Sequence, residues 1–272
     1  MRKRMSILAC LLLLVTPFYA ARVDTLWVKS TSMNKEVPVM VVVPDCAMTK
    51  TPVASPVVYL LHGHGGDARS WLQIKPELPQ LADKKGLFFV CPDGRASWYW
   101  DSPRNKDYRY ETFVSKELVQ YVDAHYATLK NRRGRAITGL SMGGHGALWN
   151  AIRHQEVFGA AGSTSGGVDI RPFPKSWNMS EQLGDYAGNE RVWDEHTVIT
   201  QLDKLQNGAL ALIIDCGEDD FFLKVNQQLH QQLLERKIGH DFITRPGVHD
   251  AKYWSNSIDF QLLFFEKYFF SK

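Results

Sequence analysis

Short apolar segments alternate along the chain with longer segments in which apolar residues recur at helical spacing. The helical spacing is visible within residues 111–129, at Phe113, Leu118, Tyr121 and Val122. This alternation predicts an α/β fold, in which a mainly parallel central sheet carries helices on both faces. We expect strands at 37–43, 56–61, 87–91, 135–140, 158–163, 210–216 and 241–245, and helices at 71–84, 111–129, 142–154, 221–235 and 255–269.

The stretch from Arg171 to about Gln206 departs from this rhythm. It contains two prolines, two tryptophans and one helical patch at 194–205. We expect a small insertion over the C-terminal edge of the sheet, where loops commonly shape a substrate pocket. No Pro/Gly/Ser-rich linker or internal repeat interrupts the chain, so residues 22–272 are predicted to form one domain.

The first residues have the layout of a secretory signal peptide. Three basic residues at positions 2–4 precede an apolar run at 7–15, and the small pair Ala20-Ala21 offers a cleavage zone. The apolar run is short for a membrane span. We therefore expect residues 1–21 to be removed and the protein to be periplasmic or secreted, without stable membrane insertion. A retained anchor, and a lipoprotein using Cys10, are the alternatives.

Composition and charge narrow the class of protein further. Of 272 residues, 44% are hydrophobic and 22% are charged, which is typical of a globular domain. The formal net charge of +3 falls to zero once the basic residues 2–4 are removed. A neutral chain without basic clusters lacks the electrostatic footprint of a nucleic-acid partner. The remaining cysteines, Cys46, Cys91 and Cys216, have no CxxC spacing, which favours free thiols over disulfides.

A nucleophile motif lies between a predicted strand and a predicted helix. Gly139-Leu140-Ser141-Met142-Gly143 matches the G-x-S-x-G pattern, and the strand–turn–helix context makes the match informative. The turn forces a strained backbone at Ser141 and lifts its hydroxyl clear of the sheet. Glycines at 139 and 143 permit the close approach of strand and helix that this turn requires.

A serine hydroxyl is a weak nucleophile unless a base removes its proton. In α/β-hydrolases the acid follows the serine in the chain, and the histidine base follows the acid. His249 is the predicted base because it follows the last strand and precedes the last helix. The acid should follow strand 210–216, where Glu218, Asp219 and Asp220 are consecutive. Asp220 stands at the entry to the next helix and is favoured, with Asp219 as the alternative. The other downstream histidines lie in predicted helices, in the insertion or before a strand: His145, His154, His196, His230 and His240.

The loop after strand 56–61 is rich in glycine and histidine. His62-Gly63-His64-Gly65-Gly66-Asp67 lets the backbone bend close to a ligand, and the N–H of His64 is the expected oxyanion donor beside that of Met142. Two histidines alone do not make a metal site. No further ligands stand at recognisable spacing, so neither a metal nor a cofactor is predicted.

With these motifs in place, the chain resembles the esterase D family in the broad sense. This family includes S-formylglutathione hydrolases, feruloyl and acetyl xylan esterases, tributyrin esterases and mycolyltransferases. The resemblance covers nearly the whole mature chain, and the run Ser-Met-Gly-Gly-His-Gly-Ala-Leu is specific to it. It implies a triad of Ser141, Asp220 and His249, with His64 and Met142 N–H groups as the oxyanion hole. The segments that carry it are 58–67, 91–94, 139–148, 216–221 and 247–254.

An aromatic segment, Trp98-Tyr99-Trp100-Asp101, is also typical of the family. Two interpretations stay open for these residues. They line an apolar acyl pocket and bind substrate, stacking on a sugar or a phenolic ring, or they simply cover the core.

The expected function is that of an exported serine carboxylesterase working through an acyl-enzyme. Its substrate would be a short-chain acyl or aryl ester, either a small molecule or an ester on a polysaccharide, such as acetyl or feruloyl groups on plant polysaccharides. Three alternatives differ in class. They are an S-formylglutathione hydrolase-like thioesterase, an acyltransferase of mycolyltransferase type, and a non-catalytic glycan-binding protein on a hydrolase scaffold.

Overall fold

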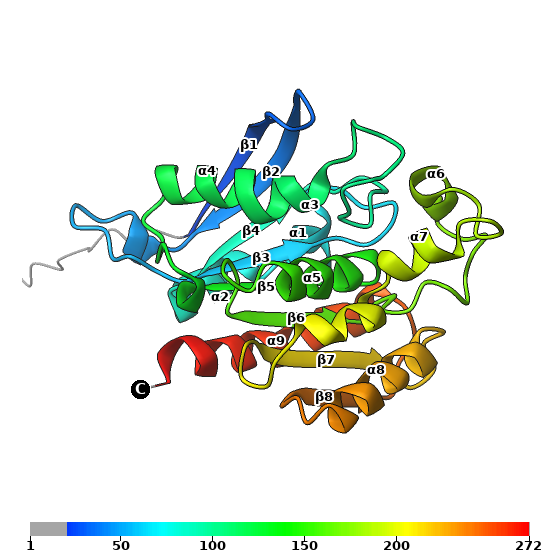
Figure 1. The fold of residues 1–272 in the computed structure, drawn as a ribbon. Coiled ribbons are helices and arrows are strands. Elements are labelled where there is room, and N and C mark those ends of the chain that lie inside the picture. Colours follow the sequence, from blue (N-terminus) through cyan, green and yellow to red (C-terminus); the bar gives the residue numbers. More distant parts are fainter. Residues whose placement is uncertain (1–20, 272) are drawn as a thin grey trace, which may run out of the picture.

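The computed structural model describes residues 21–271, so the predicted signal peptide lies outside the described residues except for Ala21. Within this range, eight strands form one sheet in the order β1-β2-β4-β3-β5-β6-β7-β8 (Figure 1). β2 is antiparallel to β1 and β4, and every other neighbouring pair is parallel. The strands are β1 (Arg22–Ser30), β2 (Lys35–Val43), β3 (Val57–Leu61), β4 (Phe88–Pro92), β5 (Arg135–Gly139), β6 (Ala160–Thr164), β7 (Ala211–Gly217) and β8 (Asp241–Arg245).

Helices cover both faces of the sheet, as predicted. α4, α5 and α8 bury their apolar residues on one face, and α1, α2 and α9 bury theirs on the other (Figure 1). The fold is therefore that of an α/β-hydrolase. The helices are α1 (Ser70–Ile74), α2 (Leu78–Lys85), α3 (Tyr110–Thr112), α4 (Leu118–His125), α5 (Met142–Arg153), α6 (Met179–Leu183), α7 (Glu190–Glu195), α8 (Leu223–Glu235) and α9 (Ala251–Phe270), with 3₁₀ turns at Asp45–Ala47, Arg132–Gly134 and Val198–Lys204.

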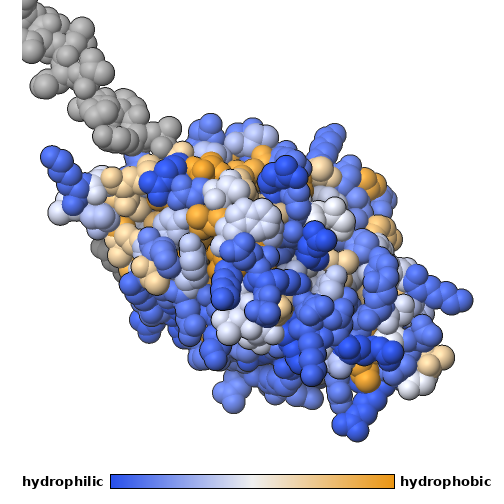
Figure 2. All heavy atoms as spheres, turned by 90° about the horizontal axis from the view of Figure 1, so that it is seen from above, coloured by the Kyte–Doolittle hydropathy of each residue, from blue (hydrophilic) through white to orange (hydrophobic). Residues whose placement is uncertain are grey.

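The central strands are buried on both faces, which explains why they are mainly apolar in the sequence rather than alternating between apolar and polar residues. Every residue of β3, β4, β5 and β6 is buried. The outer surface differs. Figure 2 shows a face dominated by hydrophilic residues, with apolar residues gathered in small patches. The cysteines Cys46, Cys91 and Cys216 are free, and the last two are buried.

Three elements differ from the sequence-based expectation. Strand β1 was not predicted. The helix expected at 71–84 is divided into α1 and α2, because Pro76 forces Lys75 out of the helical region (φ −128°, ψ 78°). The helix expected at 111–129 contains a π turn at Phe113–Glu117 and ends at His125, after which Tyr126 is extended.

The predicted insertion lies between β6 and β7 and contains α6, α7 and the 3₁₀ turn at Val198–Lys204. Its second half packs on α5, and the Ile199 N–H donates to the carbonyl of Val168 in the loop after β6. Among residues 21–271, no helix is both long and apolar enough to cross a bilayer.

Candidate active site

The turn between β5 and α5 has the strained geometry that its sequence predicts. Ser141 adopts φ 56° and ψ −118°, a conformation that side-chain-bearing residues rarely occupy. A Cβ atom on Gly143 would lie 2.2 Å from the Leu61 carbonyl oxygen, and one on Gly139 would lie 2.4 Å from the Gly143 oxygen. Glycine is therefore required at both positions, and the turn presents the Ser141 side chain at the carboxyl edge of the sheet.

Three loops at this edge bring the predicted serine, base and acid together. They follow β5, β7 and β8, three parallel strands with β6 between β5 and β7, so all three loops lie at the same carboxyl edge of the sheet (Figure 1). Ser141 Oγ lies 2.9 Å from His249 Nε2, and His249 Nδ1 lies 2.8 Å from Asp220 Oδ2. A carboxylate only accepts hydrogen bonds, so the proton of the neutral imidazole sits on Nδ1. Nε2 is then free to accept the proton of the Ser141 hydroxyl.

The structure distinguishes between the two candidate acids. Asp220 is buried, its Oδ2 faces His249, and its Oδ1 accepts the N–H of Phe222 at 2.8 Å. Asp219 is exposed and is tied to the histidine loop through its backbone, whose N–H donates to the Gly247 carbonyl at 3.0 Å. The carboxylate that contacts the imidazole is therefore that of Asp220.

The glycine-rich loop after β3 lies beside the serine. A Cβ on Gly63 would lie 3.3 Å from Ser141 Cβ. His62, which begins the loop, is buried and acts as its clamp: its Nδ1–H donates to the Gly63 carbonyl at 2.7 Å, and its Nε2 accepts the N–H of Gly94 at 2.8 Å. Met142 is the first residue of α5, so its N–H has no partner within the helix and points out of the helix N-terminus.

Comparison with known proteins places this arrangement in a family. The family model described as "Putative esterase" matches residues 30–265. The chain belongs to the Esterase family. It is 26% identical over 215 residues to an acetyl esterase of Caldicellulosiruptor saccharolyticus, covering 74% of this chain and 79% of the relative. It spans about half the length of several other curated relatives.

Solved structures of other hydrolases share the fold. The fluorophosphonate-binding serine hydrolase FphF of Staphylococcus aureus superposes with a TM-score of 0.81 at 21% identity, covering 91% of this chain and 99% of FphF. A ferulic acid esterase superposes with a TM-score of 0.78 at 26% identity, covering 92% of this chain and all of that one. The protein is an esterase.

In this esterase, the aromatic segment after β4 belongs to the interior. Trp98, Tyr99 and Trp100 are each exposed by no more than 1%. Trp98 and Trp100 stack on each other, and the Tyr99 hydroxyl donates to the His62 carbonyl at 3.2 Å. This burial favours the interpretation that the aromatic residues cover the core. Asp101 accepts two hydrogen bonds from Thr112, in α3, and so serves the fold rather than the serine loop.

His145 is a packing residue of the esterase, as its helical position predicts, but it also connects two loops to α5. It is fully buried, its Nδ1–H donates to the Gly167 carbonyl at 3.0 Å, and its Nε2 accepts the indole N–H of Trp100 at 2.8 Å. Burial lowers its pKa to about 3, so the ring is neutral. It therefore holds the loop after β4 and the loop after β6 against the helix that begins at Ser141.

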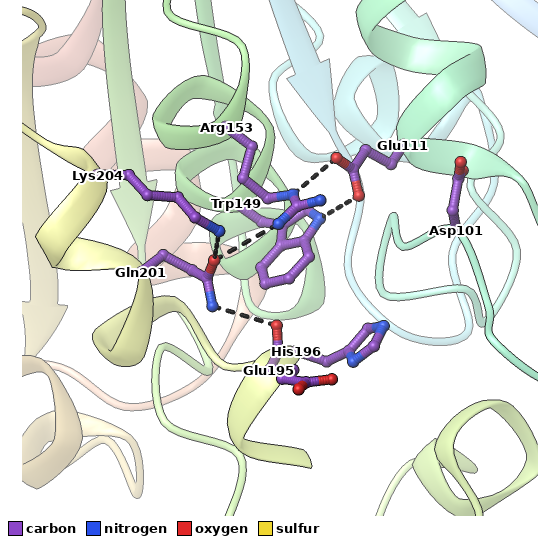
Figure 3. A pocket seen from close by; sticks show the side chains of 8 residues that line it. All are labelled: Asp101, Glu111, Trp149, Arg153, Glu195, His196, Gln201 and Lys204. Atoms are coloured by element: carbon purple, nitrogen blue, oxygen red, sulfur yellow. Dashed lines mark hydrogen bonds and ion pairs between the residues drawn. The ribbon is translucent and has the colours of Figure 1, made fainter. Parts of the chain in front are cut away.

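A polar pocket of about 370 Å³ lies further along α5 (Figure 3). Trp149 and Arg153 are eight and twelve residues beyond Ser141, which is at least about 12 Å along the helix axis. Glu111 accepts hydrogen bonds from Trp149, Arg153 and His154. Burial alone would raise the pKa of Glu111, but these donors and the Arg153 charge outweigh it and lower the pKa to about 2. Because these side chains are paired with one another, we interpret them as residues that stabilise the fold.

Sequence reasoning missed an aromatic cluster beside His249. The Phe221 ring is 51% exposed, lies 4.3 Å from the imidazole and stacks on Trp177 of the insertion at 5.7 Å. Trp254 meets the imidazole edge-on at 5.0 Å. The aromatic pair Phe221-Phe222 directly after the predicted acid is the signal that would have indicated this cluster.

The insertion also contacts the glycine-rich loop. The His64 ring Nε2 lies 3.2 Å from Asn178 Oδ1. Trp177 and Asn178 are both left-handed, with φ of 50° and 57°. The tip of the insertion thus lies against Phe221 and the His64 ring, which agrees with its predicted place at the sheet edge. Within residues 21–271, no group of three or more His, Cys, Asp or Glu side chains is placed to hold a metal ion.

Proposed function

We propose that this esterase hydrolyses carboxylic esters through an acyl-enzyme, with Ser141 as nucleophile, His249 as base and Asp220 as the acid. The observation that carries the proposal is the continuous relay from Ser141 Oγ through His249 to Asp220 at 2.9 and 2.8 Å. His249 Nε2 removes the hydroxyl proton as the serine oxygen attacks the ester carbonyl. Asp220 stabilises the imidazolium that forms.

The reaction continues with the departure of the alcohol. His249 returns the proton to the alcohol oxygen as the C–O bond of the ester breaks, which leaves the acyl group on Ser141. A water molecule then gives a proton to His249 and attacks the acyl carbon. The bond between the acyl carbon and Ser141 Oγ breaks as His249 returns that proton to the serine oxygen, which releases the acid and restores the free serine. The backbone N–H groups of His64 and Met142 are the proposed donors to the tetrahedral oxyanion, each contributing about 3 kcal/mol to the stabilisation of the transition state.

The proposed substrates are short-chain acyl or aryl esters, including esters carried on a polysaccharide. Two relatives point to these groups by name, an acetyl esterase and a ferulic acid esterase. The half-exposed Phe221 ring beside His249 offers an apolar surface against which a methyl group or a phenolic ring can pack. The predicted export of the chain agrees with a substrate outside the cytosol.

Hydrolysis of p-nitrophenyl acetate by wild type and by Ser141→Ala tests the nucleophile. We expect the variant to lose about a millionfold in kcat, as in other serine triads. Ser180→Ala, at a half-buried serine of α6, is the matched control and should keep full activity. Retained hydrolysis in Ser141→Ala would show that Ser141 is not the nucleophile.

A substrate panel then tests the acyl group. Methyl ferulate, acetylated xylan, short p-nitrophenyl esters and S-formylglutathione are compared by kcat/KM. Preference for an oxygen ester is the expected result. Preference for S-formylglutathione would instead establish the thioesterase alternative, because its acyl group leaves from sulfur.

A further inference from the structure

A second concave site lies between the β1–β2 hairpin and the loop after β4. Its volume is about 560 Å³. The most exposed aromatic residue that lines it is Trp27, which is 63% accessible to solvent. Burying the face of such a large ring would be favourable, so an exposed tryptophan at the rim of a cavity is typical of a binding surface. None of the residues proposed for catalysis lines this cavity.

The polar groups of the cavity carry both signs of charge. Lys35 and Arg95 are opposed by Glu36, Asp93 and Asp107. Lys35 is already occupied, since its Nζ donates to the Asp107 carbonyl at 2.6 Å and lies about 5 Å from the ring centres of two tyrosines. The formal sum of these five charges is −1, which offers no strong attraction to a polyanion.

The remaining polar groups are suited to hydroxyl groups. Arg95 has a side chain that is 68% exposed and a contact of only 3.9 Å with Asp93, so most of its N–H donors face solvent. The carboxylates of Glu36, Asp93 and Asp107 also line the cavity, and a carboxylate accepts hydrogen bonds. A sugar ring has an apolar C–H face that packs on an indole and a rim of hydroxyls that both donate and accept. The cavity supplies both kinds of surface.

The cavity opens on the same edge of the sheet as the serine. Trp27 pairs with Pro38, and the neighbouring Val39 pairs with Pro92 at the carboxyl end of β4. β1, which carries Trp27, is separated from β5 by β2, β4 and β3, which is about 19 Å at the usual strand spacing. The loop after β4 spans this interval, because its residues Arg95 and Asp107 line the cavity while Tyr99 contacts the loop of His62.

We propose that this cavity binds the backbone of an uncharged polysaccharide, several sugars away from the ester that Ser141 attacks. The inference rests on the proposed function, because it assigns the ester to a glycan carrier. A chain seated on Trp27 and running along the carboxyl edge of the sheet presents its acyl groups to the serine. Polysaccharide substrates then bind more tightly than small esters, while the chemical step is the same for both.

Two measurements on the full mature chain test this site. The first is the retardation of the protein by deacetylated xylan in native gels, with polygalacturonate as the anionic comparison. The second is KM for acetylated xylan beside KM for p-nitrophenyl acetate. The variants are Trp27→Ala, the conservative Trp27→Phe, and Phe270→Ala as a control at another exposed aromatic residue, 56% accessible at the end of α9.

We expect Trp27→Ala to weaken xylan binding and to raise KM for acetylated xylan about five- to tenfold, the usual worth of one aromatic contact. Trp27→Phe should recover part of the loss, and p-nitrophenyl acetate kinetics should be unchanged. Equal xylan binding in wild type and Trp27→Ala overturns the proposal, as does tighter binding of polygalacturonate than of xylan. Because deacetylated xylan carries no ester, this binding result is independent of whether Ser141 is the nucleophile.

Discussion

Replacing Asp220 by asparagine should disable the esterase by changing which nitrogen of His249 carries the proton. In the native protein, Asp220 Oδ1 accepts the Phe222 N–H at 2.8 Å while Oδ2 accepts the Nδ1–H of His249 at 2.8 Å. An asparagine has one oxygen and one NH₂ group. The buried Phe222 N–H requires an acceptor, so the amide oxygen faces it and the NH₂ group faces the imidazole.

The NH₂ group donates to Nδ1, which must then be unprotonated, and the proton moves to Nε2. An Nε2–H cannot accept the proton of Ser141, although every heavy atom keeps its place. We expect kcat to fall by about 10⁴-fold, as in another triad with the same change, which corresponds to about 5 kcal/mol in the activation free energy.

The assay is p-nitrophenyl acetate hydrolysis, with circular dichroism and thermal unfolding to establish that the variant is folded. Asp219→Asn is the matched control, because its exposed carboxylate adjoins Asp220 while its backbone N–H, which is unaltered, makes the contact to Gly247. It should keep activity within about twofold. The reasoning fails if folded Asp220→Asn retains more than a tenth of wild-type kcat, or if Asp219→Asn is the damaging change.

Three further predictions concern other parts of the molecule. Gly143→Ala should lower the free energy of unfolding, measured by urea denaturation, by at least about 3 kcal/mol, because its Cβ would lie 2.2 Å from the Leu61 oxygen. Gly239→Ala is the control and should be tolerated, because its Cβ would meet nothing nearer than 3.4 Å. Glu111→Gln should cost about 3 kcal/mol at pH 7, since the folded pKa of about 2 lies below the ordinary 4.5. That stabilisation is complete above pH 4.5 and is lost as the pH falls towards 2, so the two melting temperatures should converge in acid; a constant gap contradicts it. Phe221→Ala should raise KM for methyl ferulate about fivefold and KM for p-nitrophenyl acetate by less, because an acetyl methyl group covers less of the Phe221 ring than a phenolic ring does. Equal effects on both substrates would exclude a role in recognising the phenolic ring.

The parallel core could be predicted from the sequence because burial on both faces leaves a plain signal. The runs that form β3 and β4 are apolar, those that form β5 to β7 contain only one or two polar residues each, and the limits of all five are predicted within about two residues. β1 was not predicted, because it is not buried on both faces. It is an edge strand in which exposed residues such as Trp27 alternate with buried ones such as Val28, and its pairing with β2 is a contact between segments that local pattern does not reveal.

The candidate site followed from the sequence where chain order and turn chemistry fix position. Ser141, His249 and Asp220 were chosen by their places after particular strands, and the structure brings these three together. The surroundings did not follow. Whether Trp98 faces a ligand or the core depends on how the loop after β4 folds, and whether Phe221 meets Trp177 depends on an insertion without periodic pattern.

The placement of the insertion between β6 and β7 makes it an exchangeable cassette. β6 and β7 are hydrogen-bonded neighbours, so the segment leaves and re-enters the sheet at adjacent positions, and the sheet sets no limit on its length. The serine, histidine and aspartate all lie outside it, yet its tip carries Trp177 and Asn178 to the entrance. Recombination between related genes at these two joints would change which molecules enter while leaving the reaction intact. Grafting the corresponding segment from an acetyl or a ferulic acid esterase is therefore a direct route to new substrate selectivity with the three proposed catalytic residues unaltered.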